Sequence, residues 1–348
     1  MKKIALLALL LASCDAAPAY DRAAMLESLS DVVAVPAYRA FEAEAEILAG
    51  ATGALCEAPS EETLGAARDA WRGARTAFKR TEAFGFGPAM ERRIDGAVDF
   101  WPTRVTNIEL AIRDAGPFDA AWFESAGTSV KGLPALEYLL FDPARTDAEL
   151  LARLGEDPRR CAYVAGLGGH VAAQASLLVE AWQPGYRDML VTDDPHASVS
   201  LMVNHQIAVL EDVKLNRLSK PLGLDGAGPD PEAVESPYAG HDVAGMLATL
   251  RGVRDAWTGD RGGVEGIGLD DYVASRDPEL AADVTRRLDD VVGLTEAIDP
   301  PLRDRIAEGH TNEAEQLHQA LRETQRLFAA DVAMTLAVTV TFTDNDGD

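Results

Sequence analysis

A single glutamate, Glu137, lies within the apolar run KGLPALEYLLFD at positions 131–142. Helical spacing places Glu137 three or four residues from Leu133, Leu140 and Phe141, and therefore on the same buried face. A buried carboxylate is costly unless it is paired with a cation, hydrogen-bonded or bound to a metal. We therefore expect either a structural ion pair or a binding site for a cation. The candidate partners are Arg75, Arg92, Arg104 and Arg113.

Of the six histidines, His310 and His318 lie in the best local cluster of possible ligands, HTNEAEQLH at 310–318. His310 and Glu313, and likewise Glu315 and His318, are three residues apart, as in half of a di-iron site in a helical bundle. Such a site needs a second ExxH and two more glutamates on facing helices, and the sequence contains no second ExxH. We interpret the segment as an exposed helix face.

The sequence contains no complete catalytic motif of the common kinds. HExxH, GxSxG, a P-loop, a dinucleotide-binding fingerprint and CxxC are all absent. The terminal DNDGD resembles the opening of a calcium loop, but its glycine is misplaced and the closing glutamate is missing. A solvated acidic tail is the favoured interpretation.

The charge balance argues against a nucleic-acid partner. The chain has 57 acidic and 32 basic residues, a formal charge of −25. Binding to a phosphate backbone requires a basic face, and the sequence shows none. An acidic surface of this kind keeps an exported protein soluble.

Apolar residues repeat at helical spacing along most of the chain, which predicts an all-α protein. Ser60 is the expected N-cap of one helix. Pro36 is expected to kink or break another, and Arg322 to Val340 is expected to form the last. The clearest repeats lie in 64–78, 161–182, 243–257 and 280–291.

Proline and glycine cluster in SKPLGLDGAGPDPEAVESPYAG, residues 219–240, where the helical periodicity is lost. We therefore predict an N-terminal helical region over 21–220, a linker or loop over 221–240, and a C-terminal helical region over 241–348. A long surface loop within one bundle is the alternative.

Residues 1–20 have the pattern of an export signal, with two lysines followed by an apolar stretch and small residues. The tetrapeptide LASC at 11–14 resembles the lipobox of bacterial lipoproteins, in which Cys14 is lipidated and anchors the mature chain to a membrane. A plain secretory signal cleaved near Ala17 or Ala19 is the alternative. Either interpretation places the mature protein on the periplasmic side of the envelope, in a bacterium expected to be Gram-negative.

Removing Cys14 from the count leaves Cys56 and Cys161, an even pair in an oxidising compartment. A disulfide between them would close a long loop and contribute about 4–5 kcal/mol in the chain-entropy model. Two buried free thiols are the alternative.

Six segments in order resemble the imelysin-like family, also catalogued as imelysin peptidases. The resemblance runs from about residue 28 to the end and implies an all-α fold of two packed helical bundles, exported to the periplasm or envelope. The segments are AWRGARTAFKRTEAFGFGP (70–88), DFWPTRVTNIE (99–109), KGLPALEYLLFD (131–142), RLSKPLG (217–223), ESPYAGHDVAGMLATLRGV (235–253) and VTFTDNDGD (340–348).

The motif of that family, GxHxxE, is proposed to bind metal where the two bundles meet. Gly132 and Glu137 match its glycine and glutamate, whereas Pro134 stands at the histidine position. Proline offers no donor nitrogen to a metal, although it is well tolerated in the first turn of a helix. Any cation held by Glu137 and other carboxylates would be a hard ion, with iron the one that the resemblance implies.

The resemblance implies a ligand- or metal-binding envelope lipoprotein linked to iron uptake, with a cleft around Glu137 and transport proteins of the envelope as partners. A metallopeptidase is the first alternative, and Pro134 and the missing HExxH weigh against it. A structural or interaction lipoprotein, whose cleft holds only an arginine–glutamate ion pair, is the second.

The lipobox generates a direct prediction for Cys14. We expect the full chain, expressed in a Gram-negative host, to incorporate labelled palmitate and to sediment with membranes. The Cys14→Ala variant should lose the label and appear in the soluble periplasmic fraction. Equal labelling of both proteins would contradict lipidation at Cys14.

Overall fold

The computed structural model describes residues 20–341, and the regular elements in this range are helices. Apart from one isolated bridge between Arg261 and Val264, the described residues form no β-structure. The predicted all-α class is therefore confirmed. Cys14 with its export signal, and the terminal DNDGD, lie outside the described residues.

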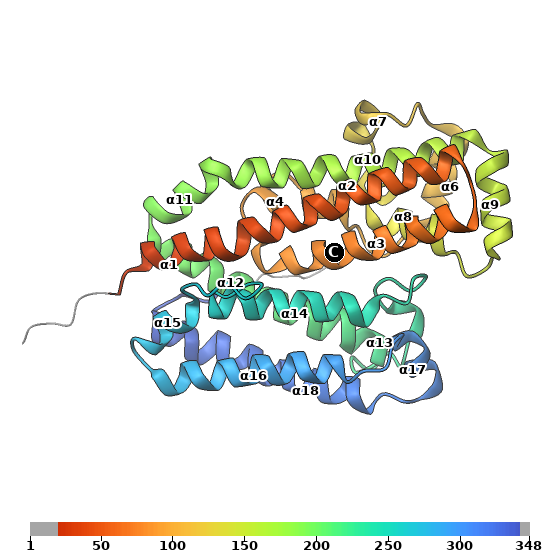
Figure 1. Ribbon diagram of the computed structural model, residues 1–348. Helices are drawn as coiled ribbons and strands as arrows, with labels where there is room; N and C mark the ends of the chain where they lie inside the picture. The colour runs from red at the N-terminus through yellow and green to blue at the C-terminus, as the bar shows by residue number, and fades with distance from the viewer. Residues whose placement is uncertain (1–19, 342–348) are drawn as a thin grey trace, which may run out of the picture.

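Three long helices form the N-terminal half: α2 (Val35–Glu57), α3 (Glu61–Thr81) and α10 (Pro158–Ala181). They pack side by side, with α2 in contact with both others (Figure 1). The shorter elements of this half are α1 (Arg22–Ser28), η1 (Leu29–Ala34), η2 (Glu82–Phe84), α4 (Pro88–Glu91), α5 (Ile94–Val98), α6 (Val105–Asp114), α7 (Ala120–Ser125), η3 (Thr128–Val130), α8 (Leu133–Phe141), α9 (Asp147–Glu156), η4 (Trp182–Tyr186) and α11 (Arg187–Thr192).

The C-terminal half is built on α14 (Asp242–Thr258), α16 (Pro278–Glu296) and α18 (Asn312–Arg326), which lie below α2 and α3 in Figure 1. Helix α12 (Pro195–Asp212) contacts α1 of the first half and α14 and α18 of the second. The remaining elements are η5 (Val213–Ser219), α13 (Lys220–Leu222), η6 (Pro231–Ala233), α15 (Leu269–Ala274), α17 (Leu302–Glu308), η7 (Leu327–Val332) and α19 (Ala333–Leu336).

The two halves meet where α3 packs on α14. Gly252 of α14 faces the backbone carbonyl of Arg80, so that a Cβ there would press into the neighbouring helix. The same contact carries an ion pair, in which Arg80 donates to Asp255 at 2.7 Å and 2.9 Å. A small residue and a two-pronged ion pair thus fix α3 close against α14.

Local signals in the sequence account for the helix starts that frame α3 and α2. Ser60 caps α3 through its hydroxyl and the N–H of Thr63, as predicted. At Pro36, where the sequence predicts a kink or a break, the π-helical turn η1 gives way to α2 without an interruption of the helical backbone. Proline in the first turn of α2 then loses no hydrogen bond that a regular helix start would make.

The last helical segment begins earlier and ends earlier than the sequence pattern predicts. It runs through α18, η7 and α19, from Asn312 to Leu336, and stops at Ala337 in the left-handed conformation. The predicted end at Val340 was wrong because the last residues, rich in valine and threonine, leave the helix. His318 therefore lies within α18, whereas His310 precedes it.

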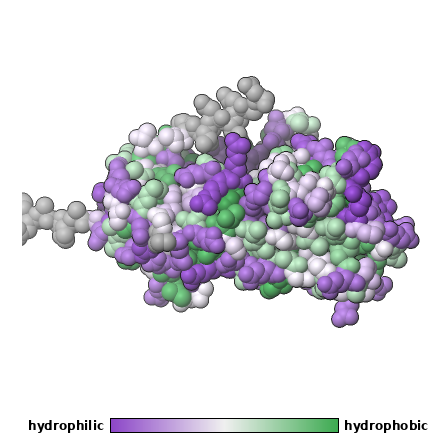
Figure 2. All heavy atoms as spheres, turned by 90° about the horizontal axis from the view of Figure 1, so that it is seen from above, coloured by the Kyte–Doolittle hydropathy of each residue, from purple (hydrophilic) through white to green (hydrophobic). Residues whose placement is uncertain are grey.

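Residues 221–240, predicted as a linker or loop, return to the protein interior at their C-terminal end. Val234, Glu235 and Ser236 are buried, although most of the preceding residues are exposed. Elsewhere on the surface, hydrophobic side chains are scattered among hydrophilic ones on the face seen in Figure 2.

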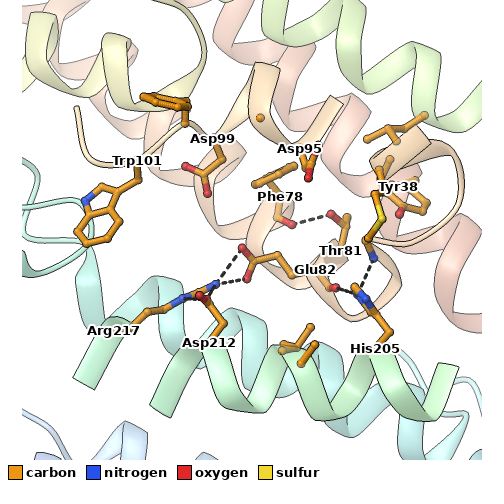
Figure 3. A pocket seen from close by; sticks show the side chains of 18 residues that line it. Tyr38, Phe78, Thr81, Glu82, Asp95, Asp99, Trp101, His205, Asp212 and Arg217 are labelled. Carbon is orange, nitrogen blue, oxygen red and sulfur yellow. Dashed lines mark hydrogen bonds and ion pairs between the residues drawn. The ribbon is translucent and has the colours of Figure 1, made fainter. Parts of the chain in front are cut away.

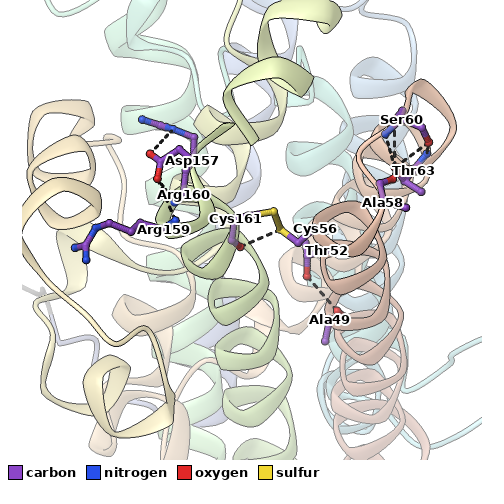
Figure 4. Close-up of a disulfide and its surroundings, with 10 residues drawn as sticks. All are labelled: Ala49, Thr52, Cys56, Ala58, Ser60, Thr63, Asp157, Arg159, Arg160 and Cys161. Carbon is purple, nitrogen blue, oxygen red and sulfur yellow. Dashed lines mark hydrogen bonds and ion pairs between the residues drawn. A yellow bond between two sulfur atoms is a disulfide. The ribbon is translucent and has the colours of Figure 1, made fainter. Parts of the chain in front are cut away.

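Cys56 and Cys161 form a disulfide with a sequence separation of 105 residues (Figure 4). It joins the C-terminal end of α2 to the first turn of α10. Closing so long a loop lowers the conformational entropy of the unfolded chain and therefore stabilises the fold.

This disulfide predicts a large effect of reduction on stability. The Cys56→Ser/Cys161→Ser variant should lose about 4–5 kcal/mol of free energy of unfolding, measured by urea denaturation of oxidised protein. Dithiothreitol should destabilise the wild type similarly and leave the double variant unchanged. An equal response of both proteins to reductant would contradict this role of the disulfide.

Candidate functional site

Helix α8 carries the residues that match the GxHxxE motif, and the structure explains each of them locally. Gly132 has φ +83°, and a Cβ there would collide with the backbone of Val98, so only glycine fits. Pro134 lies in the first turn of α8, where its missing N–H costs nothing. Trp71 of α3 donates its indole N–H to the carbonyl of Leu133 at 2.9 Å and holds this turn in place.

Glu137 is 1% exposed, and its Oε1 accepts two backbone N–H groups, from Tyr238 and Ala239, each at 2.9 Å. Burial raises the pKa of Glu137 to about 7, although the two N–H donors and the charge of Arg75 act in the opposite direction. The carboxylate therefore joins α8 to the segment that leads into α14.

Two charged side chains of helix α3, Arg75 and Lys79, point into the protein interior. Both side chains are only 1% exposed, and Glu82 follows one turn later. The spacing of four and three residues puts all three groups on one side of the helix. Cations so deeply buried require carboxylates from other segments.

Lys79 binds three carboxylates: Glu82 at 2.8 Å, Asp99 at 2.7 Å and Glu235 at 2.7 Å. Arg75 also pairs with Asp99 and lies 3.5 Å from Glu235. These pairs bring together α3, the turn after α5 and the segment before α14. We call this group, together with Arg217, the ion cluster: Arg75, Lys79, Glu82, Asp99, Arg217 and Glu235.

Arg217 completes the ion cluster from the π-helical turn η5. It binds Glu82 at 2.9 Å and Asp212 at 2.8 Å, and donates to the hydroxyl of Thr249 on α14 at 2.9 Å. In an α-helix, residues five apart point about 140° away from each other. The wider π turn brings Asp212 and Arg217 to the same side, as π-turns at functional sites often do.

The cations of the cluster keep Asp99 and Glu82 ionised. Burial alone raises the pKa of Asp99, but the charges of Arg75 and Lys79 outweigh burial and hold that pKa below its usual range. Burial likewise opposes ionisation of Glu82, whose pKa is lowered by Arg217 and Lys79. The cluster is therefore a set of charged groups rather than a set of shared protons.

A cavity of about 400 Å³ opens beside the ion cluster. Its wall includes Glu82, Asp99 and Arg217 of the cluster (Figure 3). Its other labelled residues are Tyr38, Phe78, Thr81, Asp95, Trp101, His205 and Asp212. A concave, largely apolar space with a few converging polar groups is typical of a small-molecule site.

His205 lines the same cavity, and its Nε2 lies 2.7 Å from the carbonyl oxygen of Glu82 and 3.1 Å from the backbone nitrogen of Gly85. Burial lowers the pKa of His205 below its usual value, although the neighbouring carbonyl of Glu82 acts in the opposite direction. The imidazole is therefore neutral at pH 7 and adds no positive charge to the wall.

Of the four arginines considered as partners of Glu137, Arg75 is the one whose charge acts on it. Arg92, Arg104 and Arg113 are exposed. Two backbone amides, which the sequence pattern did not indicate, provide the direct hydrogen bonds. In the 310–318 segment, His310, Glu313 and Glu315 are exposed, and His318 is half-buried.

The residues around Glu137 do not assemble the metal site that the motif implies. Pro134 offers no ligand atom, Oε1 of Glu137 already accepts two N–H groups, and the charge of Arg75 opposes a cation there. Among residues 20–341, no group of three or more His, Cys, Asp or Glu side chains is placed to hold a metal ion.

Reasoning from the sequence missed the ion cluster, although a signal for it was present. Asp99, Arg217 and Glu235 are each the first residue of a segment that carried the family resemblance. Arg75, Lys79 and Glu82 lie within another such segment, 70–88. Residues of opposite charge therefore occurred in separate segments of the resemblance, and this was the indication that these segments meet.

Comparison with known proteins agrees with the family resemblance found in the sequence. The family model described as Imelysin matches residues 34–328. Iron-regulated protein A of Synechococcus elongatus is 27% identical over 313 residues, which cover 86% of this chain and 82% of that protein.

Two solved structures share the fold. The crystal structure of a putative iron-regulated protein A precursor from Parabacteroides distasonis has a TM-score of 0.77 at 19% identity, covering 90% of this chain and 96% of that one. An imelysin-like protein from Psychrobacter arcticum has a TM-score of 0.76 at 20% identity, covering 92% and 97%.

The buried carboxyl of Glu137 predicts a specific pH dependence of stability. Its pKa in the folded protein, about 7, exceeds its ordinary value of 4.5, so its contribution is complete below pH 4.5 and is lost as the pH rises through 7. The loss amounts to roughly 3 kcal/mol.

The Glu137→Gln variant, which resembles the protonated form, should therefore match the wild type at pH 5 and exceed it in stability at pH 9. Urea denaturation of both proteins across this range measures the difference. A wild type that gains stability over the variant as the pH rises would show that Glu137 has a lowered pKa instead.

The ion cluster predicts a large cost for removing its central cation. Lys79→Met keeps an apolar stem but leaves buried carboxylates unpaired, so the free energy of unfolding should fall by about 3–5 kcal/mol. Arg72→Met on the same helix is the matched control, because that side chain is 42% exposed and pairs with exposed Asp69. Its cost should stay below about 1 kcal/mol. Similar costs for the two variants in urea denaturation would contradict the role assigned to Lys79.

Proposed function

The chain belongs to the imelysin family, and we propose that it is an envelope lipoprotein that binds a small ligand during iron uptake. The observation that carries the proposal is the cavity of about 400 Å³ walled by the ion cluster. Side chains that are buried and charged on one side of such a cavity are costly to maintain for stability alone. They are expected where a ligand is recognised.

The link to iron comes from the relatives. The name of the Synechococcus elongatus protein describes it as iron-regulated, and it resembles this chain over most of its length. We extend that link to this chain as a proposal. Iron, or a compound that carries it, is then cargo rather than a resident cofactor.

The proposed location is the periplasmic face of a membrane, with lipidated Cys14 as the anchor. The acidic character of the chain, with 57 acidic and 32 basic residues, fits a soluble domain held near a membrane rather than pressed onto anionic lipid. Transport proteins of the envelope are the proposed partners.

Ligand binding is proposed as the function in preference to peptide hydrolysis. A catalytic zinc normally has three protein ligands and one open position. Glu137 accepts backbone N–H groups and has Pro134 where the motif has histidine. A metallopeptidase would therefore need ligands other than the motif supplies.

The experiment pairs a cellular measurement with a cavity-filling variant. A strain that lacks this gene should accumulate iron-55 more slowly in iron-limited medium, and the wild-type gene should restore the rate. Ala208→Trp should fail to restore it, because Ala208 lines the cavity without belonging to the ion cluster. Ala66→Trp, at an exposed position of α3, is the control and should restore the rate fully.

Unchanged iron accumulation in the deletion strain would refute the link to iron. Full rescue by Ala208→Trp, with both variants present at wild-type levels, would refute the assignment of the cavity as the binding site.

A further inference from the structure

The wall of the cavity has an excess of negative charge. Among the described residues, four carboxylates line it, from Glu82, Asp95, Asp99 and Asp212, together with one cation, Arg217. Behind the wall, Arg75 and Lys79 face Asp99 and Glu235. Three cations thus meet five carboxylates, so two negative charges are left without a matching cation.

The unmatched charge lies on the cavity side of the cluster. Asp95 makes no ion pair with any described residue and is exposed where the cavity opens. Asp212 shares Arg217 with Glu82, and its side chain is 41% exposed. Figure 3 shows Asp95 and Asp212 on opposite sides of the cavity, with Glu82 between them.

Aromatic side chains supply the rest of the recognition surface. Phe100 and Trp101 line the cavity and are half-buried, so their rings are not fully covered by other protein groups. Phe78 and Tyr38 also line the cavity and are buried, and the Tyr38 hydroxyl is already used, since it donates to the carbonyl of Phe84 at 2.6 Å. Aromatic faces attract cations, and tryptophan does so best.

From these observations we propose that the cavity binds an organic cation, an ammonium or guanidinium group carried on an apolar or aromatic body. The positive group is expected near Asp95, the carboxylate of the wall that has no ion pair with a described residue, and the body against Trp101 and Phe78. The inference rests on the proposed function, because it names the class of ligand for the same cavity. An iron chelator with an amine substituent is one cargo that presents such a group.

An anionic ligand is disfavoured by the same geometry. The guanidinium of Arg217, the one cation that residues 20–341 contribute to the cavity wall, already binds Glu82, Asp212 and Thr249. An anion would have to compete for it while facing the unmatched carboxylates.

The test uses three probes of nearly equal shape: phenethylamine, phenethyl alcohol and phenylacetate. Isothermal titration of the protein starting at Asp15, at pH 7 and low salt, should show the ammonium binding at least about tenfold more tightly than the other two. Asp95→Asn should weaken binding of the ammonium by about tenfold, the share of one charge-assisted hydrogen bond. Trp101→Leu should weaken it as well, and Glu46→Gln, at an exposed carboxylate of α2 outside the cavity wall, should not.

Equal or tighter binding of the alcohol or the carboxylate, abolished by Ala208→Trp, would overturn the cation assignment and leave the proposed function standing. Binding of none of the three probes would also overturn it, and the iron-accumulation measurement then decides the proposed function separately. Ammonium binding unaffected by Asp95→Asn and Ala208→Trp would place the cation elsewhere and overturn the proposal.

Discussion

The structure depends on one constraint, the neutralisation of Lys79 in the protein interior. An ammonium group that is 1% exposed cannot be desolvated without partners, and the local sequence supplies only Glu82 of η2, directly after α3. Asp99 and Glu235 must therefore come from segments distant in sequence. Satisfying this one charge brings the turn after α5 and the entry to α14 against α3, and so joins the two halves beside the cavity.

The motif residues in and directly before α8 stabilise the same junction between the two halves, from its other side. Gly132 and Pro134 set the start of the helix, and Glu137 holds the backbone of Tyr238 and Ala239. That backbone lies only three residues beyond Glu235. The carboxylate thus positions the segment that delivers Glu235 to Lys79. This use of the motif glutamate does not depend on a histidine at position 134.

Much of the fold was predictable, because helical periodicity and caps are local signals. The α class, the cap at Ser60 and the burial of Glu137 follow from residues close in sequence. The ion cluster was not predicted, because all its pairs except Lys79–Glu82 join residues 18 to 160 positions apart along the chain, and spacing within one helix cannot indicate them. The π turn at η5 could not be predicted either, because a hydrophobic period of 3.6 residues indicates only a regular α-helix. In a regular α-helix Asp212 and Arg217 would point away from each other.

The central claim is that Lys79 and Glu235 are directly coupled across the junction. A double-mutant cycle with Lys79→Met, Glu235→Gln and the combined variant, measured by urea denaturation, isolates that coupling. We predict an interaction free energy of about 2 kcal/mol or more, as for charged groups that are buried and in contact. Costs that simply add, with an interaction near zero, would contradict the account of how the two halves are joined.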